Sequence, residues 1–243
     1  MVKSSYDTLI DRTDKALTKA KQIAACLKTS TNVEAMALEF ELESYFPAMT
    51  KVVDAARRRY AGEKVPNEDK VFSIFEAHTE LIQRGKRDKP IEFGHKISLS
   101  ESKEKFITDY EVFLRSPSDK KLLEPAVESH HELFLEYPSG VATDMGFHPG
   151  KDEFDGLVDD YDGKVKYFGV PGRLCEFGDA LMSTFQRWRA GIEGTISCLK
   201  RAFRLSRCHF KGFKHFCSGV GSAIFCHNIL TMVRQEMLAE LPE

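Results

Sequence analysis

Two strand-like segments lie in the stretch "IEFGHKISLSESKEKFITDYEVFL", residues 91–114. Apolar and polar side chains alternate in residues 91–100 and again in residues 106–114, as in strands with one buried face. A third segment, "KVFSIFEAHTEL" (residues 70–81), comes before them and is rich in Val, Ile and Phe, which favour strands. Polar connections, among them "RGKRDKP" (residues 84–90), join the three segments. The sequence therefore predicts an antiparallel meander of three strands.

Helical and strand-like segments alternate after this meander. They are, in order, a helix in residues 118–137, a short strand in 139–144, an acidic helix in 150–161, a strand in 165–170, and helices from Asp179 to Leu241 with a break near residues 205–212. The order β-β-β-α-β-α-β-α predicts an α/β fold, with a mixed sheet flanked by helices.

The N-terminal 66 residues have a helical pattern instead. Two apolar-periodic segments are separated by "KTSTN" (residues 28–32), where Thr31 or Asn32 can cap the second helix. Pro47 is expected to kink that helix, and Gly62 with Pro66 closes the region. We therefore expect a helical segment in residues 1–66 and an α/β domain in residues 67–241.

Length and composition indicate a globular protein. The chain has 243 residues, of which 42% are hydrophobic and 30% charged, and a formal net charge of -2. The first 25 residues have no continuous apolar stretch of the kind found in signal peptides. The longest apolar run, Val220–Val233, contains His227 and Asn228 and is too short to span a bilayer, so it is expected to be a buried helix. We expect a cytoplasmic protein with no membrane role.

Basic residues are concentrated between Thr184 and Cys217. Eight lysines and arginines lie there, interleaved with Trp188, Phe203, Phe210 and Phe213, and Glu193 is the only acid. This composition suits contacts with nucleic-acid phosphates and unstacked bases, although a solvated basic face is the ordinary alternative. Glu193, in "RWRAGIEGTISCLKR" (residues 187–201), is either an ion-pair partner of Arg189 or a metal ligand.

Three acids are placed where they could form a metal site. Glu76 lies near the end of the first predicted strand, Asp144 ends the fourth, and Glu193 lies on the helix after the last strand. Carboxylates from strand ends and from a covering helix can meet at one edge of a sheet, and Mg²⁺ prefers oxygen ligands. Each also has an ordinary interpretation, as a solvated glutamate, a turn aspartate or a helix ion pair. The six cysteines lack CxxC spacing, which disfavours a zinc site.

Several segments resemble the catalytic part of the DDE transposases encoded by bacterial insertion sequences. They are "GEKVPNEDKVFSIFEAHTELIQRGKRDKPIEFGHKISL" (residues 62–99), "ATDMGF" (142–147) and "FQRWRAGIEGTISCLKRAFRLSRC" (185–208). Arg189, Glu193 and Lys200 reproduce the family's spacing of Arg, three residues, Glu, six residues, Lys. Gln186 stands where the family usually has Tyr. The resemblance runs from about residue 55 to residue 233.

The resemblance implies a ribonuclease-H-like fold and DNA transposition. Three acids would bind two Mg²⁺ ions, for which Mn²⁺ can substitute: Glu76, or else Glu80, with Asp144 and Glu193. Water would cleave the transposon end, and the freed 3′-hydroxyl would attack target DNA. The cations that would contact DNA are Arg187, Arg189, Lys200, Arg201 and Arg204. The implied partners are double-stranded DNA, as terminal inverted repeats and as target, and a second subunit in a DNA-bound homodimer; the implied location is the cytoplasm, at the nucleoid.

Two other functions remain open. The family usually has an N-terminal helix-turn-helix, which the first residues do not show, and the interval from Val170 to Thr184 is short, so the chain resembles a truncated copy. The first alternative is therefore a non-catalytic DNA-binding remnant. The second is a metal-dependent nuclease or phosphatase without strand transfer.

Overall fold

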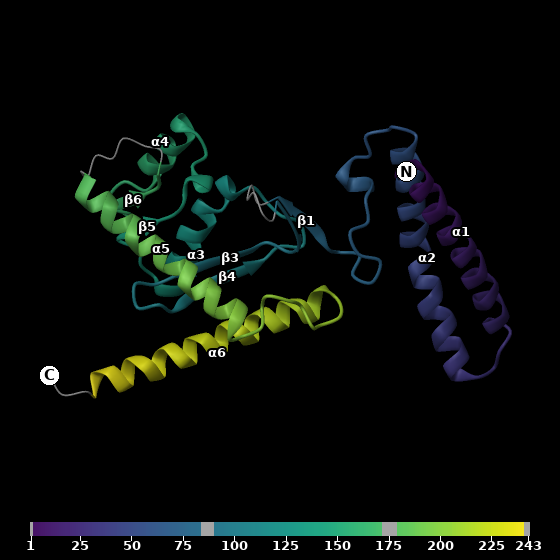
Figure 1. Ribbon diagram of the computed structural model, residues 1–243. Coiled ribbons are helices and arrows are strands. Elements are labelled where there is room, and N and C mark those ends of the chain that lie inside the picture. Colours follow the sequence, from purple (N-terminus) through teal and green to yellow (C-terminus); the bar gives the residue numbers. More distant parts are fainter. Residues whose placement is uncertain (1, 84–89, 172–178, 241–243) are drawn as a thin grey trace. The chain divides into compact units, whose positions relative to one another are not determined.

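The computed structural model describes residues 2–83, 90–171 and 179–240 (Figure 1). Contacts divide the chain into two compact units, residues 1–94 and 95–243. The predicted domain boundary after residue 66 lies inside the first unit. The predicted connector at residues 84–90 falls almost entirely outside the described residues, as does part of the interval from Val170 to Thr184.

The first unit begins with a helical hairpin, as predicted. Helix α1 (Val2–Leu27) and helix α2 (Val33–Tyr60) pack side by side. Asn32 caps α2, because its side-chain oxygen accepts a hydrogen bond of 2.8 Å from the backbone N–H of Glu34. Pro47 lies within α2, which continues past it. An ion pair between Arg57 and Asp14 links the two helices.

The segment predicted as the first strand is mostly irregular. Residues 70–79 contain turns and bends after a short 3-10 helix η1 (Asn67–Asp69), and only β1 (Glu80–Gln83) is a strand. It pairs antiparallel with β2 (Ile91–Gly94). The apolar residues of the irregular segment make ring contacts instead, such as Tyr45 with Phe75 and Phe72 with Phe93. The Val, Ile and Phe residues of this segment therefore do not indicate a strand; its phenylalanines contact neighbouring rings.

The second unit contains four strands and four α-helices among its described residues. They are β3 (Ile97–Glu101), β4 (Ile107–Val112), α3 (Leu123–Phe134), β5 (Gly140–Ala142), α4 (Lys151–Asp160), β6 (Tyr167–Gly169), α5 (Asp179–Arg201) and α6 (Phe213–Ala239), with short 3-10 helices η2 (Asp119–Lys121) and η3 (Met145–Phe147). The predicted helices and the last two predicted strands are confirmed, with boundaries shifted by a few residues.

The predicted ribonuclease-H-like mixed sheet is wrong. In the described part of the chain the strands form three separate two-stranded sheets: β1–β2 and β3–β4 are antiparallel, and β5–β6 is parallel. The second predicted strand, residues 91–100, is divided after Gly94 into β2 and β3, and Gly94 has a φ of 147°, which is accessible to glycine and strained for other residues. Alternation along the sequence identifies half-buried strands, but it does not identify their partners.

Two hydrophobic clusters hold the second unit together. One joins α3, α4 and β6, and its most buried members include Leu123, Val127, Phe154 and Val170. The other joins β4, α5 and α6 through Ile107, Leu199, Val220, Ala223 and Ile224. Helix α5 extends from the β5–β6 pair to α6 (Figure 1), and it thus connects the two clusters.

Candidate functional site

Helix α5 is fixed on the β5–β6 pair by Phe185. A Cβ atom at Gly140 or at Gly169 would lie 2.8 Å from atoms of the Phe185 side chain, so the ring occupies the space that two glycines leave open. Gln186, the position where the resembled family has Tyr, donates a hydrogen bond of 3.3 Å to the carbonyl oxygen of Gly169. These contacts set the position of the helix that carries Arg189, Glu193 and Lys200.

The second half of α5 is fixed on the β3–β4 hairpin. Thr195, which is buried, donates a hydrogen bond to the carboxylate of Glu101, whose side chain is only 4% exposed. Lys105 forms an ion pair of 2.6 Å with Glu101 and covers Gly191, where any Cβ would overlap the lysine side chain. Glu101 thus has a cation and a hydroxyl donor within the protein, as a buried carboxylate requires.

Arg189, Glu193 and Lys200 share one side of α5. At about 100° per residue they fall within about 40° of one another around the helix axis, on the side opposite to Gly191 and Thr195. Glu193 and Lys200 are exposed, and Arg189 is partly buried. The charged triplet, as we call these three residues, is therefore accessible to a ligand over about three turns of helix.

Glu193 forms an ion pair with Arg189, which was the ordinary alternative to its role as a metal ligand. Its Oε1 lies 3.5 Å from a guanidinium nitrogen of Arg189, and its side chain is 70% exposed. The Nε atom of Arg189 is buried and has no hydrogen-bond partner among the described residues. Water screens an exposed pair of this kind, so it stabilises the helix by no more than a few tenths of a kcal/mol.

Asp144 lies just beyond the end of β5, where the sequence predicted it. Its Oδ1 accepts a hydrogen bond of 2.8 Å from the backbone N–H of Gly146 and caps η3. Asp119, which the sequence reasoning missed, lies close by: a Cβ at Gly146 would be 3.0 Å from Asp144 Oδ1 and 3.4 Å from Asp119 Oδ2. Lys96 neutralises Asp119 through an ion pair of 2.8 Å. No local signal pointed to Asp119, because it follows a different strand and is 25 positions away.

Glu76 and Glu80 belong to the first unit. Glu76 lies in the irregular segment before β1, not at a strand end, and its carboxylate is 2.7 Å from His78 Nε2. Glu80 is the first residue of β1. Asp144 and Glu193 belong to the second unit. Within the described residues, no three His, Cys, Asp or Glu side chains are grouped so that they could hold a metal ion. The two-metal site that the resemblance implies therefore stays a prediction.

The other predicted DNA-binding residues lie at the two ends of α5. Arg187 is exposed near its start and donates a hydrogen bond to Thr184. Lys200 and Arg201 form its last turn, and Arg204 follows in a left-handed conformation, with φ of 60°. The sequence continues with Arg207, Lys211 and Lys214, so cations extend from α5 to the start of α6. This basic strip carries no carboxylate other than Glu193.

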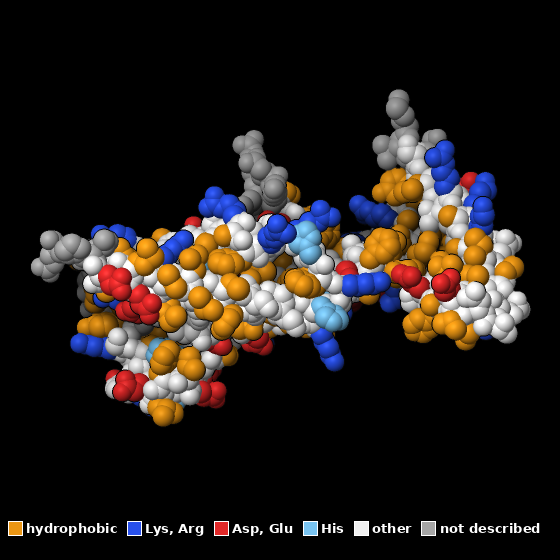
Figure 2. Space-filling model, turned by 90° about the horizontal axis from the view of Figure 1, so that it is seen from below, with side chains coloured by type: hydrophobic (Ala, Val, Ile, Leu, Met, Phe, Trp, Pro, Cys, Tyr) orange, Lys and Arg blue, Asp and Glu red, His pale blue; other side chains and the backbone are white. Residues whose placement is uncertain are grey.

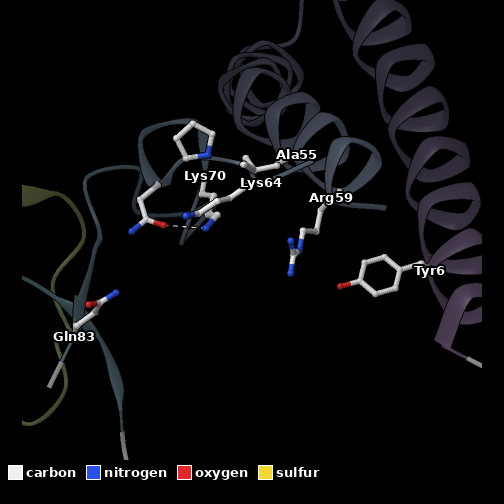
Figure 3. A pocket seen from close by; sticks show the side chains of 10 residues that line it. Tyr6, Ala55, Arg59, Lys64, Lys70 and Gln83 are labelled. Carbon is white, nitrogen blue, oxygen red and sulfur yellow. Dashed lines mark hydrogen bonds between the residues drawn. The ribbon is translucent and has the colours of Figure 1, made fainter. Parts of the chain in front are cut away.

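The first unit contains a hollow of about 880 Å³ that the sequence reasoning did not anticipate (Figure 3). Its lining includes three cations, Arg59, Lys64 and Lys70, together with Tyr6, but no acid; Lys70 is hydrogen-bonded to Asn67 (2.9 Å). The neighbouring Arg58 is instead committed to Glu63, and these hydrogen bonds hold the pKa of Glu63 below its usual value. The uncompensated cations make the hollow chemically suited to an oxyanion.

Comparison with protein-family models, curated proteins and solved structures found no match to this chain.

Proposed function

We propose that the chain takes part in DNA transposition and contacts DNA through α5, as its resemblance to the DDE transposases implies. The observation that supports this most is that Arg189 and Lys200 share one side of α5, and that Arg201 and Arg204 follow at its C-terminal end. Phosphate groups lie along both strands of DNA, and a helix whose cations share one side can approach several of them at once.

The proposed chemistry is Mg²⁺-dependent cleavage at transposon ends followed by strand transfer. Asp144 and Glu193 provide carboxylate oxygens of the kind that Mg²⁺ or Mn²⁺ prefers, and both are accessible. Since the described residues contain no three-acid group, we derive no catalytic step from their geometry. In this function the protein would act on double-stranded DNA in the cytoplasm, at the nucleoid.

Cleavage can be tested with Mg²⁺ and a labelled duplex that carries the ends of the element. The expected result is nicking at the end, abolished in Asp144→Asn and in Glu193→Gln. Asp152→Asn, which removes the charge of an exposed acid on α4, is the matched control and should cleave as the unmodified protein does. Cleavage that persists in both site variants would sink the catalytic assignment.

A non-catalytic DNA-binding protein is the second candidate. It is favoured by the exposed ion pair of Glu193 with Arg189 and by the absence of a metal-holding group among the described residues. In this case binding should persist in EDTA and weaken steeply with salt. Replacing Lys200 and Arg201 by Gln should lower the salt slope by about 0.9 for each phosphate that the variant no longer neutralises. The control Lys103→Gln, at an exposed lysine of the β3–β4 turn, should leave the slope unchanged.

A further inference from the structure

Helix α6 has apolar side chains on both of its sides. One side is buried in the second unit, and includes Gly219, Val220, Ala223, Ile224, His227 and Thr231. The other side is open: Phe225 is 65% exposed, Ile229 42% and Met232 48%. Figure 2 looks onto this part of the molecule and shows hydrophobic side chains over much of the surface. A helix that is apolar all round is normally covered all round.

The exposed apolar residues form one continuous face. Phe225, Ile229 and Met232 follow one another at spacings of four and three residues and therefore lie on one side of the helix. This side is opposite to Val220 and Ala223, which are buried. Lys214 and Glu236 lie on the same side, one near each end of the helix. We call these five residues the outer face of α6.

The contacts of α6 do not suit insertion of this helix into a lipid bilayer. By length and composition α6 could cross a membrane, but polar side chains tie it to the β3–β4 hairpin. Asn228 accepts a hydrogen bond of 2.9 Å from the backbone N–H of Ile107 and donates one of 2.8 Å to its carbonyl oxygen. His227 Nε2 lies 3.2 Å from the carbonyl oxygen of Lys105. These bonds hold α6 as a packed helix of a folded unit.

The arrangement of charge on the outer face is symmetric about Phe225. Lys214 and Glu236 are each eleven residues from Phe225, which is about three helical turns. Neither side chain has an ion-pair partner within the described residues. Two such helices placed antiparallel, with their Phe225 residues adjacent, would bring Lys214 of each against Glu236 of the other.

We propose that the outer face of α6 pairs antiparallel with the outer face of a second copy of this chain, about a two-fold axis at Phe225. Such an interface is self-complementary, since every contact occurs twice. In this register Met232 lies opposite Ser218 of the second copy, so that a large side chain meets a small one and the axes can approach to about 8–10 Å. Tyr110 of β4 borders the outer face, because its hydroxyl lies next to Gly221 and the residue is 40% exposed. The pairing requires no DNA and does not rest on the proposed function.

The experiment measures the mass of the full chain in solution by analytical ultracentrifugation, without DNA. We expect a dimer whose affinity falls at least about tenfold in Lys214→Glu, and likewise in Glu236→Lys, because each change places like charges opposite one another. The combined variant, with both changes, should recover the dimer. Phe225→Glu should give a monomer that keeps the circular dichroism of the unmodified protein.

Leu238→Glu is the matched control, since Leu238 is 66% exposed but lies off the outer face; it should leave the dimer intact. A monomer at all concentrations would overturn the proposal. A dimer whose affinity is unchanged in both charge-reversal variants would also overturn it. So would a protein that stays monomeric and binds phospholipid vesicles through α6. Loss of the dimer in both single variants without recovery in the combined variant would overturn the antiparallel register.

Discussion

Helices α5 and α6 are similar in length and pack into the same hydrophobic cluster, yet their outward sides differ. The buried sides meet at Leu199 of α5 and Val220 of α6, next to Ile107 of β4. The outward side of α5 carries Arg189, Glu193 and Lys200, whereas the outer face of α6 carries Phe225, Ile229 and Met232. Packing into a core thus determines one side of each helix only, and for the other side we propose a different partner in each case: DNA for α5 and a second copy of the chain for α6.

Removing the anchor of α5 should have the largest effect on stability. Phe185→Ala deletes a buried ring that fills the space over two glycines, and we expect a loss of about 3–5 kcal/mol in the free energy of unfolding. Phe225→Ala removes the same ring from the open side of α6 and should change the stability of the dilute monomer by about 0.5 kcal/mol or less. Urea unfolding followed by circular dichroism measures both, and equal losses would contradict the difference between a buried and an open side.

Placing an additional methyl group against Phe185 should reduce stability less than removing the Phe185 ring. Gly169→Ala places a methyl group 2.8 Å from Phe185, and also 3.2 Å from the carbonyl oxygen of Val141, and should destabilise by about 1–3 kcal/mol. Gly156, on α4, has open space around it, and Gly156→Ala should stabilise the helix by up to about 1 kcal/mol. Thermal unfolding of the two variants should therefore shift the midpoint in opposite directions.

The polar anchor of α6 can be tested at Asn228. Asn228→Ala leaves the N–H and C=O of Ile107 without their side-chain partner, and we expect a loss of about 1–3 kcal/mol in the free energy of unfolding. Gln235→Ala removes one exposed hydrogen bond to Glu104 and should cost less than about 1 kcal/mol. Hydrogen exchange at the Ile107 amide should speed up in the first variant and not in the second.

The smallest stability effect is expected in the charged triplet. A double-mutant cycle with Arg189→Gln and Glu193→Gln should give a coupling energy of about 0.3–0.5 kcal/mol, because the pair is exposed and four residues apart on one helix. A coupling above about 1.5 kcal/mol would show that Glu193 serves mainly to fix Arg189. A small coupling leaves the carboxylate available for a ligand.

Local patterns predicted the helices well. A sequence shows directly the features that depend on neighbours within a few positions. These include the caps and periodicity of residues 1–60 and the break between α5 and α6. The strand predicted at residues 70–81 was wrong because Phe72 and Phe75 contact the rings of Phe93 and Tyr45, and such ring contacts require no strand.

Non-local pairing accounts for what the sequence did not reveal. The mixed sheet was wrong because alternation does not identify the partners of a strand, and because the strand predicted at residues 91–100 is divided at Gly94 into two strands of different sheets. At the candidate site, Asp144 follows β5 close to the strand end where it was predicted, and an acid that was not among the predicted residues, Asp119, borders the same glycine. Only the folded chain shows that the loops after β4 and β5 meet.

Lys105, in the turn between β3 and β4, contacts both α5 and α6. Its carbonyl oxygen lies 3.2 Å from His227 Nε2 of α6, while its ammonium group covers Gly191 of α5 and pairs with Glu101. A movement of either helix must therefore displace a residue that the other helix contacts. If DNA on α5 shifts this turn toward the form favoured by paired copies, thermodynamic reciprocity requires that pairing raise the affinity for DNA by the same factor. Such coupling would allow a protein with two separate binding surfaces to respond to both partners together.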